Sequence, residues 1–288
     1  MRHSFPATAT ALLLVILFVS EPICAGSIDT EKLQSLGDVD YIAFSPGKPD
    51  RDLHVFVDLP ERYEETSDRY PVVYLLDGGN TFPLLAAYHH YLRFGDEAPP
   101  LILVGISYGA DSFQEGNLRQ TDFTAPSPER DFWGGADVFL RALETELIPT
   151  IERTYRADPD RRLLYGHSLG GQLVLFTAMH KPGLFSGLIA CNPAIIGNLG
   201  YFLDADNLVE AESERVRLFL GLAEHERPEL KANTLAWVQR WQATPSPWEL
   251  EFRILAGQTH LSSVAEGFRH GLTSLLPSAR AGDSESQP

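Results

Sequence analysis

The chain has 288 residues, of which 44% are hydrophobic and 22% charged, and its formal net charge is −16 at pH 7. This length and composition predict an ordinary globular protein with one large core and do not require a second domain. The strong excess of negative charge argues against a polyanion such as nucleic acid as a partner.

The first 25 residues have the pattern of an export signal. Arg2 and His3 precede an uncharged run with a dense apolar block at 11–19, and small residues follow at 25–27. The block is too short to span the roughly 30 Å hydrocarbon core of a bilayer, whereas it matches the apolar region of a signal peptide. We therefore expect 1–25 to be a signal peptide, the mature protein to be periplasmic or secreted, and no stable membrane span after cleavage. The alternatives are an uncleaved anchor and a buried helix.

Strand patterns dominate the first half of the expected mature chain. Alternating apolar residues predict half-buried strands, and continuous apolar runs predict buried strands; together they place strands at 38–44, 53–59, 70–76 and 101–106. Asn80 is placed to cap a helix that continues to about residue 92. Residues 108–135 form a long polar segment without a clear period, which is typical of a functional loop.

Helices and strands alternate in the second half. The expected helices span 136–155, 172–180, 228–241 and 262–276, and the expected strands span 162–165, 185–191, 216–222 and 249–255. This alternation, with unbroken apolar strands, predicts a three-layer α/β fold in which helices cover both faces of a mainly parallel central sheet. A single domain is expected over 26–276, followed by a disordered polar tail at 277–288.

The motif Gly166-His-Ser168-Leu-Gly170 lies between a predicted strand and a predicted helix. A nucleophilic serine in this place occupies a sharp turn that exposes its hydroxyl above the sheet, and the turn brings the flanking backbones so close that glycines are needed. The following helix directs backbone N–H groups at the position where an oxyanion forms. We therefore predict an α/β-hydrolase fold with Ser168 as nucleophile and the N–H of Leu169 as one oxyanion donor.

A serine nucleophile needs a base, and in this fold an acid and then a histidine follow the serine along the chain. Among the downstream histidines, His180 ends a helix, His225 precedes the last strand and His270 lies within the last helix. His260 follows the last strand after a short loop and precedes a helix, which is where a base can reach back over the sheet. His260 is therefore the predicted base.

The acid that orients this histidine is expected after the preceding strand. No aspartate occurs between Asp206 and Asp283, so an acid from this region must be a glutamate. Glu224 and Glu226 both follow the predicted strand 216–222, and their spacing does not decide between them.

The remaining site residues are expected in loops. The second oxyanion donor is predicted to be the N–H of Gly79, because the turn Asp77-Gly-Gly-Asn80 follows an early strand and its glycines allow close approach of the backbone. Residues 108–135 and 192–214 are expected to border the pocket and to supply substrate contacts from Arg119, Trp133, Tyr201 and Phe202. The sequence contains no nucleotide-binding glycine loop and no H-E-x-x-H motif. We predict no metal site and no cofactor.

Several further motifs occur in a distinctive order between residues 39 and 276. They are Tyr70-Pro-Val-Val-Tyr-Leu-Leu-Asp-Gly78, Val104-Gly-Ile106, Arg119 with Asp122, Gly135-Ala-Asp-Val-Phe-Leu140, Glu146-Leu-Ile-Pro149 with Tyr155, Gly166-His-Ser-Leu-Gly-Gly171 and Gly257-x-x-His260. This series resembles the esterases related to enterochelin esterase and esterase D, within the α/β-hydrolases. In that family a glycine, two residues and the acid often follow the strand, and the best superposition places Ala223 at the glycine. The resemblance thus favours Glu226 as the acid, with Glu224 as the second choice.

The resemblance implies ester chemistry on a small molecule. Relatives cleave siderophore trilactones, thioesters or simple esters, and some acylate sugars. We therefore predict a serine carboxylesterase-type enzyme that cleaves an ester or thioester of siderophore type or with a small acyl group. Two alternatives are transfer of the acyl group to an alcohol or sugar, and a non-catalytic binding protein on a hydrolase scaffold.

Overall fold

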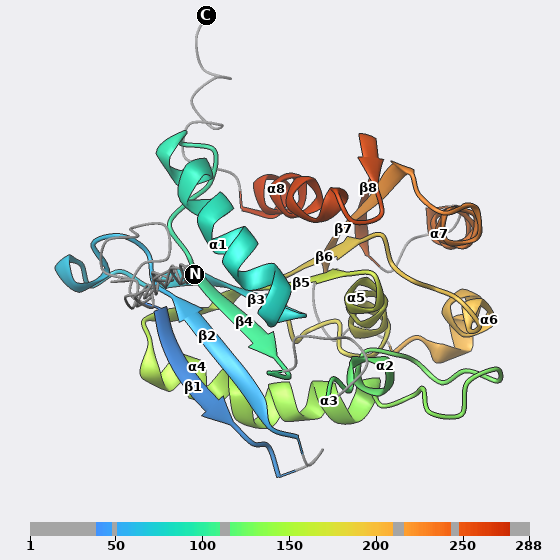
Figure 1. The fold of residues 1–288 in the computed structure, drawn as a ribbon, viewed down its shortest axis with the longest axis horizontal. Coiled ribbons are helices and arrows are strands. Elements are labelled where there is room, and N and C mark those ends of the chain that lie inside the picture. The colour runs from blue at the N-terminus through green and yellow to red at the C-terminus, as the bar shows by residue number, and fades with distance from the viewer. Residues whose placement is uncertain (1–38, 48–50, 110–115, 210–215, 243–247, 277–288) are drawn as a thin grey trace, which may run out of the picture.

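A computed structural model describes residues 39–47, 51–109, 116–209, 216–242 and 248–276 (Figure 1). The predicted signal peptide at 1–25 and the predicted tail at 277–288 lie outside the described residues. Within those residues, no helix is both long enough and apolar enough to cross a membrane.

The central feature is an eight-stranded sheet with the order β1-β2-β4-β3-β5-β6-β7-β8. The first pairs, β1 with β2 and β2 with β4, are antiparallel, and all later pairs are parallel. The strands are β1 (Val39–Phe44), β2 (Leu53–Asp58), β3 (Tyr70–Leu75), β4 (Ile102–Ser107), β5 (Ala157–His167), β6 (Gly187–Cys191), β7 (Arg217–His225) and β8 (Glu249–Thr259). All parallel strands end at one edge of the sheet, so the loops that follow them lie together.

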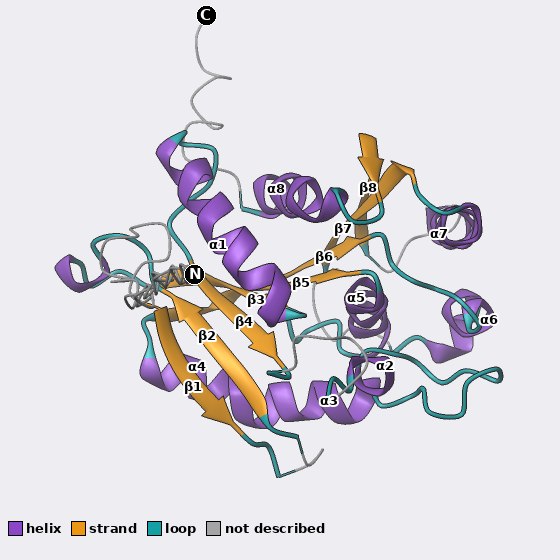
Figure 2. Cartoon of the chain, in the orientation of Figure 1, coloured by secondary structure: helices purple, strands orange, loops and turns teal. Residues whose placement is uncertain are grey.

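Helices cover both faces of this sheet (Figure 1; Figure 2). One face carries α1 (Gly78–Phe94) and α8 (Ser263–Leu275); the other carries α3 (Ala136–Ala142), α4 (Ile148–Thr154), α5 (Leu169–His180) and α7 (Pro228–Gln242). The short helices α2 (Arg119–Asp122) and α6 (Leu199–Leu203) and the 3-10 turns Tyr63–Glu65 and Ala205–Asn207 lie in connections. The predicted three-layer α/β arrangement is confirmed.

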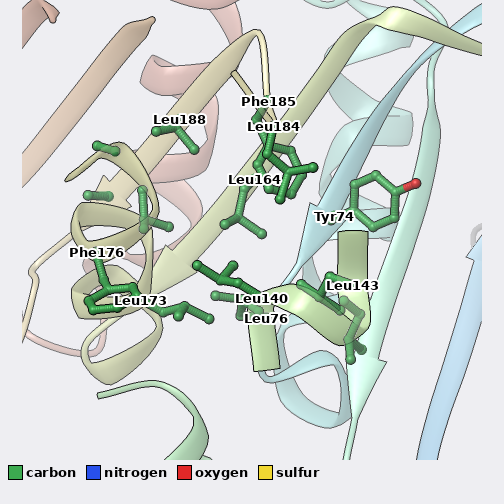
Figure 3. Close-up of a cluster of buried hydrophobic side chains, with 14 of the residues drawn as sticks. Tyr74, Leu76, Leu140, Leu143, Leu164, Leu173, Phe176, Leu184, Phe185 and Leu188 are labelled. Carbon is green, nitrogen blue, oxygen red and sulfur yellow. The ribbon is translucent and has the colours of Figure 1, made fainter. Parts of the chain in front are cut away.

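Two hydrophobic cores hold the layers together. Side chains alternate between the faces of a strand, so Tyr74 of β3 packs in the core beneath α3–α5, whereas Val73 and Leu75 pack beneath α1 and α8. Figure 3 shows the first core, in which Tyr74 of β3 and Leu164 of β5 lie near Leu140 of α3 and Leu173 of α5. Because both faces of β3 are covered, its sequence is apolar throughout.

Several element boundaries differ from the prediction. The expected helix 136–155 is interrupted by a π-helical turn at Leu143–Leu147, just before Pro149. Proline has no N–H to donate to the residue four positions earlier, and its ring crowds that carbonyl, so the turn widens there. At the start of α1 the capping position belongs to Asp77, and the N–H of Asn80 donates to the Asp77 carbonyl (2.9 Å). The prediction that Asn80 caps this helix was wrong.

Two late strands are longer than expected. β7 continues to His225 and β8 to Thr259, with a register shift between Ala223 and His225. The segment just before His260, expected as a loop, is therefore strand. This pairing positions the glutamates at the end of β7 beside the residues that follow β8.

Candidate active site

Ser168 occupies a sharp turn between β5 and α5. Its backbone has φ 59° and ψ −118°, a conformation that L-residues rarely adopt. A Cβ at Gly166 would collide with the carbonyl oxygen of Gly170, and a Cβ at Gly171 would lie 2.9 Å from the carbonyl oxygen of Cys191. The glycines thus allow the chain to fold back on itself, and the turn holds the half-buried Ser168 hydroxyl at the carboxyl edge of the sheet.

The structure brings Ser168, His260 and Glu226 together. The Ser168 Oγ lies 3.1 Å from His260 Nε2, and His260 Nδ1 lies 2.5 Å from Glu226 Oε2. The Glu226 side chain is completely buried, whereas that of His260 is 17% exposed. A carboxylate can only accept hydrogen bonds, so His260 Nδ1 carries a proton and, in the neutral ring, Nε2 is free to accept the serine proton.

Glu224, the second candidate acid, contacts the backbone of Gly257 and not the ring of His260. Its side chain is exposed at the end of β7, and Oε2 accepts a hydrogen bond from the N–H of Gly257 (2.8 Å). Because β7 ends at His225, the next residue turns inward, and the other carboxylate oxygen of Glu226 accepts the N–H of Arg227 (2.7 Å). Of the two candidate acids, the structure places Glu226 against His260.

Three side chains that the sequence analysis did not identify hold the backbone of His260. Its carbonyl oxygen accepts hydrogen bonds from His167 Nε2 (2.6 Å), Ser263 Oγ (2.9 Å) and Asn192 Nδ2 (3.3 Å). The Asn192 side chain also accepts the N–H of Ala223 (2.6 Å), so it links the end of β7 to the loop after β8. No sequence motif indicates these contacts, because they join segments from four different strands.

His167 precedes the serine and is buried against the candidate base. The His167 and His260 ring centroids lie 4.7 Å apart. Burial, and secondarily the nearby His260, lower the pKa of His167 to about 4. His167 is therefore neutral at pH 7, and its proton resides on Nε2, which donates to a carbonyl.

The two predicted oxyanion donors lie at the starts of neighbouring helices. Leu169 begins α5 and Gly79 lies in the first turn of α1, where helical N–H groups have no partner within the helix. β3 and β5, which lead to these helices, are adjacent in the sheet. The Asp77 turn is braced by Arg119, whose Nε and Nη2 donate to Asp77 Oδ1 and Oδ2 at 2.6 and 2.7 Å.

Comparison with known proteins identifies the family. A family model described as "Putative esterase" matches residues 47–269, more than half of the chain. The chain belongs to this esterase family. It is a serine hydrolase that cleaves ester bonds, and the predicted fold and resemblance are confirmed.

Two curated esterases and two solved structures illustrate the relationship. The ferri-bacillibactin esterase of Bacillus subtilis (strain 168) is 30% identical over 238 residues, which cover 74% of this chain and 80% of that protein. The apo-salmochelin esterase of Escherichia coli O6:H1 is 33% identical over 116 residues, 37% of this chain and 36% of that protein. The structure of the BES protein from Bacillus cereus has a TM-score of 0.72 at 21% identity and covers 94% of this chain and 99% of its own. That of an IroE-like serine hydrolase from Shewanella oneidensis has a TM-score of 0.69 at 25% identity, with 82% and 80% covered.

The structure buries two of the predicted substrate contacts in this esterase, Phe202 and Arg119. Phe202 of α6 is completely buried in the first hydrophobic core, so its side chain has no exposed surface. Arg119 is 9% exposed, and its guanidinium donates hydrogen bonds to the Asp77 carboxylate. Arg119 therefore supports the turn that carries Gly79, and its contact with substrate stays a prediction.

The other two predicted contacts are partly exposed. The Tyr201 hydroxyl pairs with His180 Nε2 (2.7 Å) at the C-terminal end of α5. That end lies roughly 18 Å along the helix from Ser168, since an α-helix rises 1.5 Å per residue. Trp133 lies under the guanidinium of Arg130 (4.8 Å to the ring centroid). Contact of Trp133 with substrate stays a prediction.

Gln172 joins the two loop segments that were expected to border the site. This buried side chain in the first turn of α5 accepts the N–H of Ala125 (3.1 Å) and donates to the carbonyl of Ala194 (2.5 Å). Both segments therefore pack beside the serine turn. Within the described residues, no group of three or more His, Cys, Asp or Glu side chains is arranged to hold a metal ion. That the enzyme needs no cofactor stays a prediction.

Proposed function

We propose that Ser168, His260 and Glu226 form the catalytic triad of this esterase. His260 Nε2 takes the proton of the Ser168 hydroxyl as Oγ attacks the ester carbonyl. His260 then gives that proton to the departing alcohol, which leaves an acyl-enzyme on Ser168. Water attacks this acyl group while His260 takes its proton, and His260 then returns that proton to Ser168 Oγ as the acid leaves. The chain of contacts from Ser168 Oγ to His260 (3.1 Å) and on to Glu226 (2.5 Å) carries this assignment.

The negative oxygen of each tetrahedral intermediate is stabilised, in this proposal, by the N–H groups of Leu169 and Gly79. Each belongs to a helix start that directs its unpaired amides and positive dipole end outward. Removing a single oxyanion donor typically slows turnover 10²- to 10³-fold. The preorganised backbone is therefore a major part of the catalytic effect.

The proposed substrate is a siderophore-type ester. The support is that curated relatives are a ferri-bacillibactin esterase and an apo-salmochelin esterase. We also propose that the protein is exported, because residues 1–25 have the composition of a signal peptide. Mass spectrometry of the protein recovered from the producing cells tests this: cleavage near residue 25 is expected, and an intact N-terminus would contradict export by this route.

A fluorophosphonate probe tests the nucleophile. The wild-type protein should be labelled covalently, and Ser168→Ala should abolish both labelling and hydrolysis of a siderophore trilactone. Ser186→Ala, which changes an exposed serine at the opposite edge of the sheet, is the matched control. Labelling that persists in Ser168→Ala would refute the assignment.

The acid is tested by comparing Glu226→Gln with Glu224→Gln. An amide at 226 cannot hold His260 as a carboxylate does, so kcat should fall by up to about 10⁴-fold. Glu224→Gln should change kcat by less than about tenfold, because its carboxylate accepts its hydrogen bond from the Gly257 backbone and not from His260. A larger loss of kcat in Glu224→Gln would show that Glu224 is the acid. A small loss in both variants would show that neither glutamate orients His260.

A further inference from the structure

β8 forms one edge of the central sheet (Figure 1). It pairs with β7 on one side, and no described strand pairs with its other side. An unpaired edge presents a row of backbone N–H and C=O groups that can pair with another strand, and proteins often block such an edge with a short strand or a proline. β8 is 11 residues long and contains no proline. Its outer edge is therefore suited to pairing with a second strand.

One face of β8 carries an apolar row that the fold covers only in part. Side chains alternate between the faces of a strand, and those on the face that carries α7 are Leu250, Phe252 and Ile254. Leu250 and Phe252 are only partly buried against the first hydrophobic core, and Ile254 is 42% exposed. Contact with a second apolar surface would remove this row from water and stabilise the complex.

The other face of β8 carries one negative and one positive side chain, Glu251 and Arg253, beside α8. The Glu251 carboxylate accepts a hydrogen bond from Ser274 Oγ (2.5 Å), and Arg253 Nη1 lies 2.7 Å from His270 Nδ1. Arg253 Nη2 donates to Glu251 (2.9 Å), yet the two side chains are still 45% and 41% exposed. Each charge can therefore also meet the opposite charge of a neighbouring strand.

The sequence of β8 is complementary to itself when two copies run antiparallel. With Phe252 opposite Phe252 of a second copy, Glu251 of each copy lies opposite Arg253 of the other, and Leu250 lies opposite Ile254. A shift of two residues in one direction puts Glu251 opposite Glu251, and in the other direction Arg253 opposite Arg253; both arrangements are disfavoured by like charges. A shift of one residue sets the apolar row against the charged face. One register therefore satisfies both faces, and it has two-fold symmetry.

We propose that the protein forms a two-fold symmetric dimer in which β8 pairs antiparallel with β8 of a second copy of this chain, centred on Phe252. The two eight-stranded sheets become one continuous sheet. On the α8 face, Glu251 and Arg253 of both copies form a closed group of four alternating charges. On the other face, the two apolar rows pack together. The proposal does not depend on the assignment of the catalytic triad.

Charge exchange tests the register by sedimentation velocity over a concentration series. The buffer has physiological ionic strength, because the net charge of −16 on each copy opposes association at low salt. The wild type should be a dimer that dissociates on dilution. Arg253→Glu and Glu251→Arg should each weaken the dimer about tenfold or more, since each sets like charges opposite one another. An equimolar mixture of the two variants should dimerise again, because every charge then faces its opposite. Arg141→Glu, at an exposed ion pair in α3, is the matched control.

A double variant, Glu251→Arg with Arg253→Glu, separates association from folding because it keeps the ion pair within the strand. It should dimerise with itself as the wild type does. It should not form mixed dimers with the wild type, because the paired positions would then carry like charges. This comparison holds even if a single charge variant fails to fold, which its circular dichroism spectrum and urea midpoint would show.

A disulfide tests the centre of the pairing. In Phe252→Cys the two new thiols lie directly opposite, with Cα atoms about 4.5 or 5.5 Å apart, so mild oxidation should give a covalent dimer. Ile254→Cys is the matched control, because its two copies lie roughly 14 Å apart along the strands. Cys191 is buried and should not react.

Three results would overturn the proposal. The first is a wild-type protein that sediments as a monomer at every concentration. The second is mixed dimers of the wild type and the double variant that form as readily as either dimer alone. The third is cross-linking of Ile254→Cys as efficient as that of Phe252→Cys.

Discussion

Two strand-to-helix turns at the same edge of the sheet make an informative comparison. The β5–α5 turn carries Ser168 and the β3–α1 turn carries Asp77, and both residues have positive φ, 59° and 57°. Their ψ values differ: −118° at Ser168 and 39° at Asp77. The value at Asp77 belongs to the ordinary left-handed region, which aspartate tolerates, whereas that at Ser168 is strained.

The difference shows how the two turns are stabilised. Ser168 is held by its surroundings: its N–H donates to Cys191 (3.0 Å) and its carbonyl accepts from Gln172 and Ala194 (3.0 and 2.9 Å). The Asp77 turn is held through its side chain, by the paired hydrogen bonds from Arg119. Backbone strain thus occurs at the proposed nucleophile, and a buried ion pair occurs at the turn that carries the proposed oxyanion donor.

Removing the ion pair between Arg119 and Asp77 should have the largest effect on stability and on kcat. Arg119→Met leaves the Asp77 carboxylate buried without its partner, and such a loss typically destabilises a protein by about 3 kcal/mol or more. Gly79 should also lose its position, so kcat should fall by up to about 10²-fold with a smaller change in KM. Urea unfolding and steady-state kinetics measure the two effects. Arg141→Met, which removes an exposed ion pair with Asp137, is the control and should change stability by less than about 1 kcal/mol.

An acid-stability experiment compares a buried histidine at the β5–α5 turn with one inside the helix that follows the Asp77 turn. Burial is the main cause that lowers the pKa of both His167, at the β5–α5 turn, and His89, in α1, to about 4. In the unfolded chain histidine has a pKa of about 6.5, so the unfolded state binds more protons and stability falls as the pH drops from about 6.5 to 4. Each histidine should account for up to roughly 3 kcal/mol of this loss.

His167→Gln and His89→Gln should each reduce the loss of stability between pH 7 and pH 4.5, measured as the shift of the urea midpoint. The reduction should be similar for the two, because burial is the first cause in both cases and neighbouring basic side chains also disfavour both charged forms. Exposed His225→Gln is the control. Equal behaviour of all three variants would show that the two buried rings are not kept neutral by their surroundings.

The smallest expected effect measures the strain at the nucleophile. Ser168→Gly and Ser168→Ala are both inactive in the proposed mechanism, so their difference in unfolding free energy reports on the backbone alone. Glycine should be the more stable by about 2 kcal/mol, since a strained residue costs about 1–3 kcal/mol. At Arg62, which has φ 63° and ψ 22°, the unfolding free energies of Arg62→Gly and Arg62→Ala should differ by only about 1 kcal/mol. An equal difference at both positions would show that Ser168 is not specially strained.

The local part of this structure could be predicted from the sequence. Alternating apolar residues and continuous apolar runs predicted the eight strands, and the spacing of Gly166, Ser168 and Gly170 predicted the turn that the structure shows. The element ends were less predictable: Asn80 does not cap α1, and β8 runs on to Thr259, because partner strands and packing decide where an element stops.

The side chains around the site depended on contacts between distant segments. Glu224 and Glu226 could not be separated by spacing, and the end of β7 at His225 is what turns the second of them toward His260. Arg119 was expected to contact substrate, yet its partner Asp77 lies 42 residues away in the chain. The carbonyl of His260 is held by His167, Asn192 and Ser263, and no motif in the sequence indicates these contacts.

By itself the sequence determined the sheet with its covering helices, the serine turn, and the chain order of serine, glutamate and histidine, because periodicity and glycine placement act on neighbouring residues. Only the tertiary structure decided which glutamate faces the histidine and which polar side chains support the site. Those outcomes depend on how strands far apart in the chain pair and pack, and no local pattern encodes that arrangement.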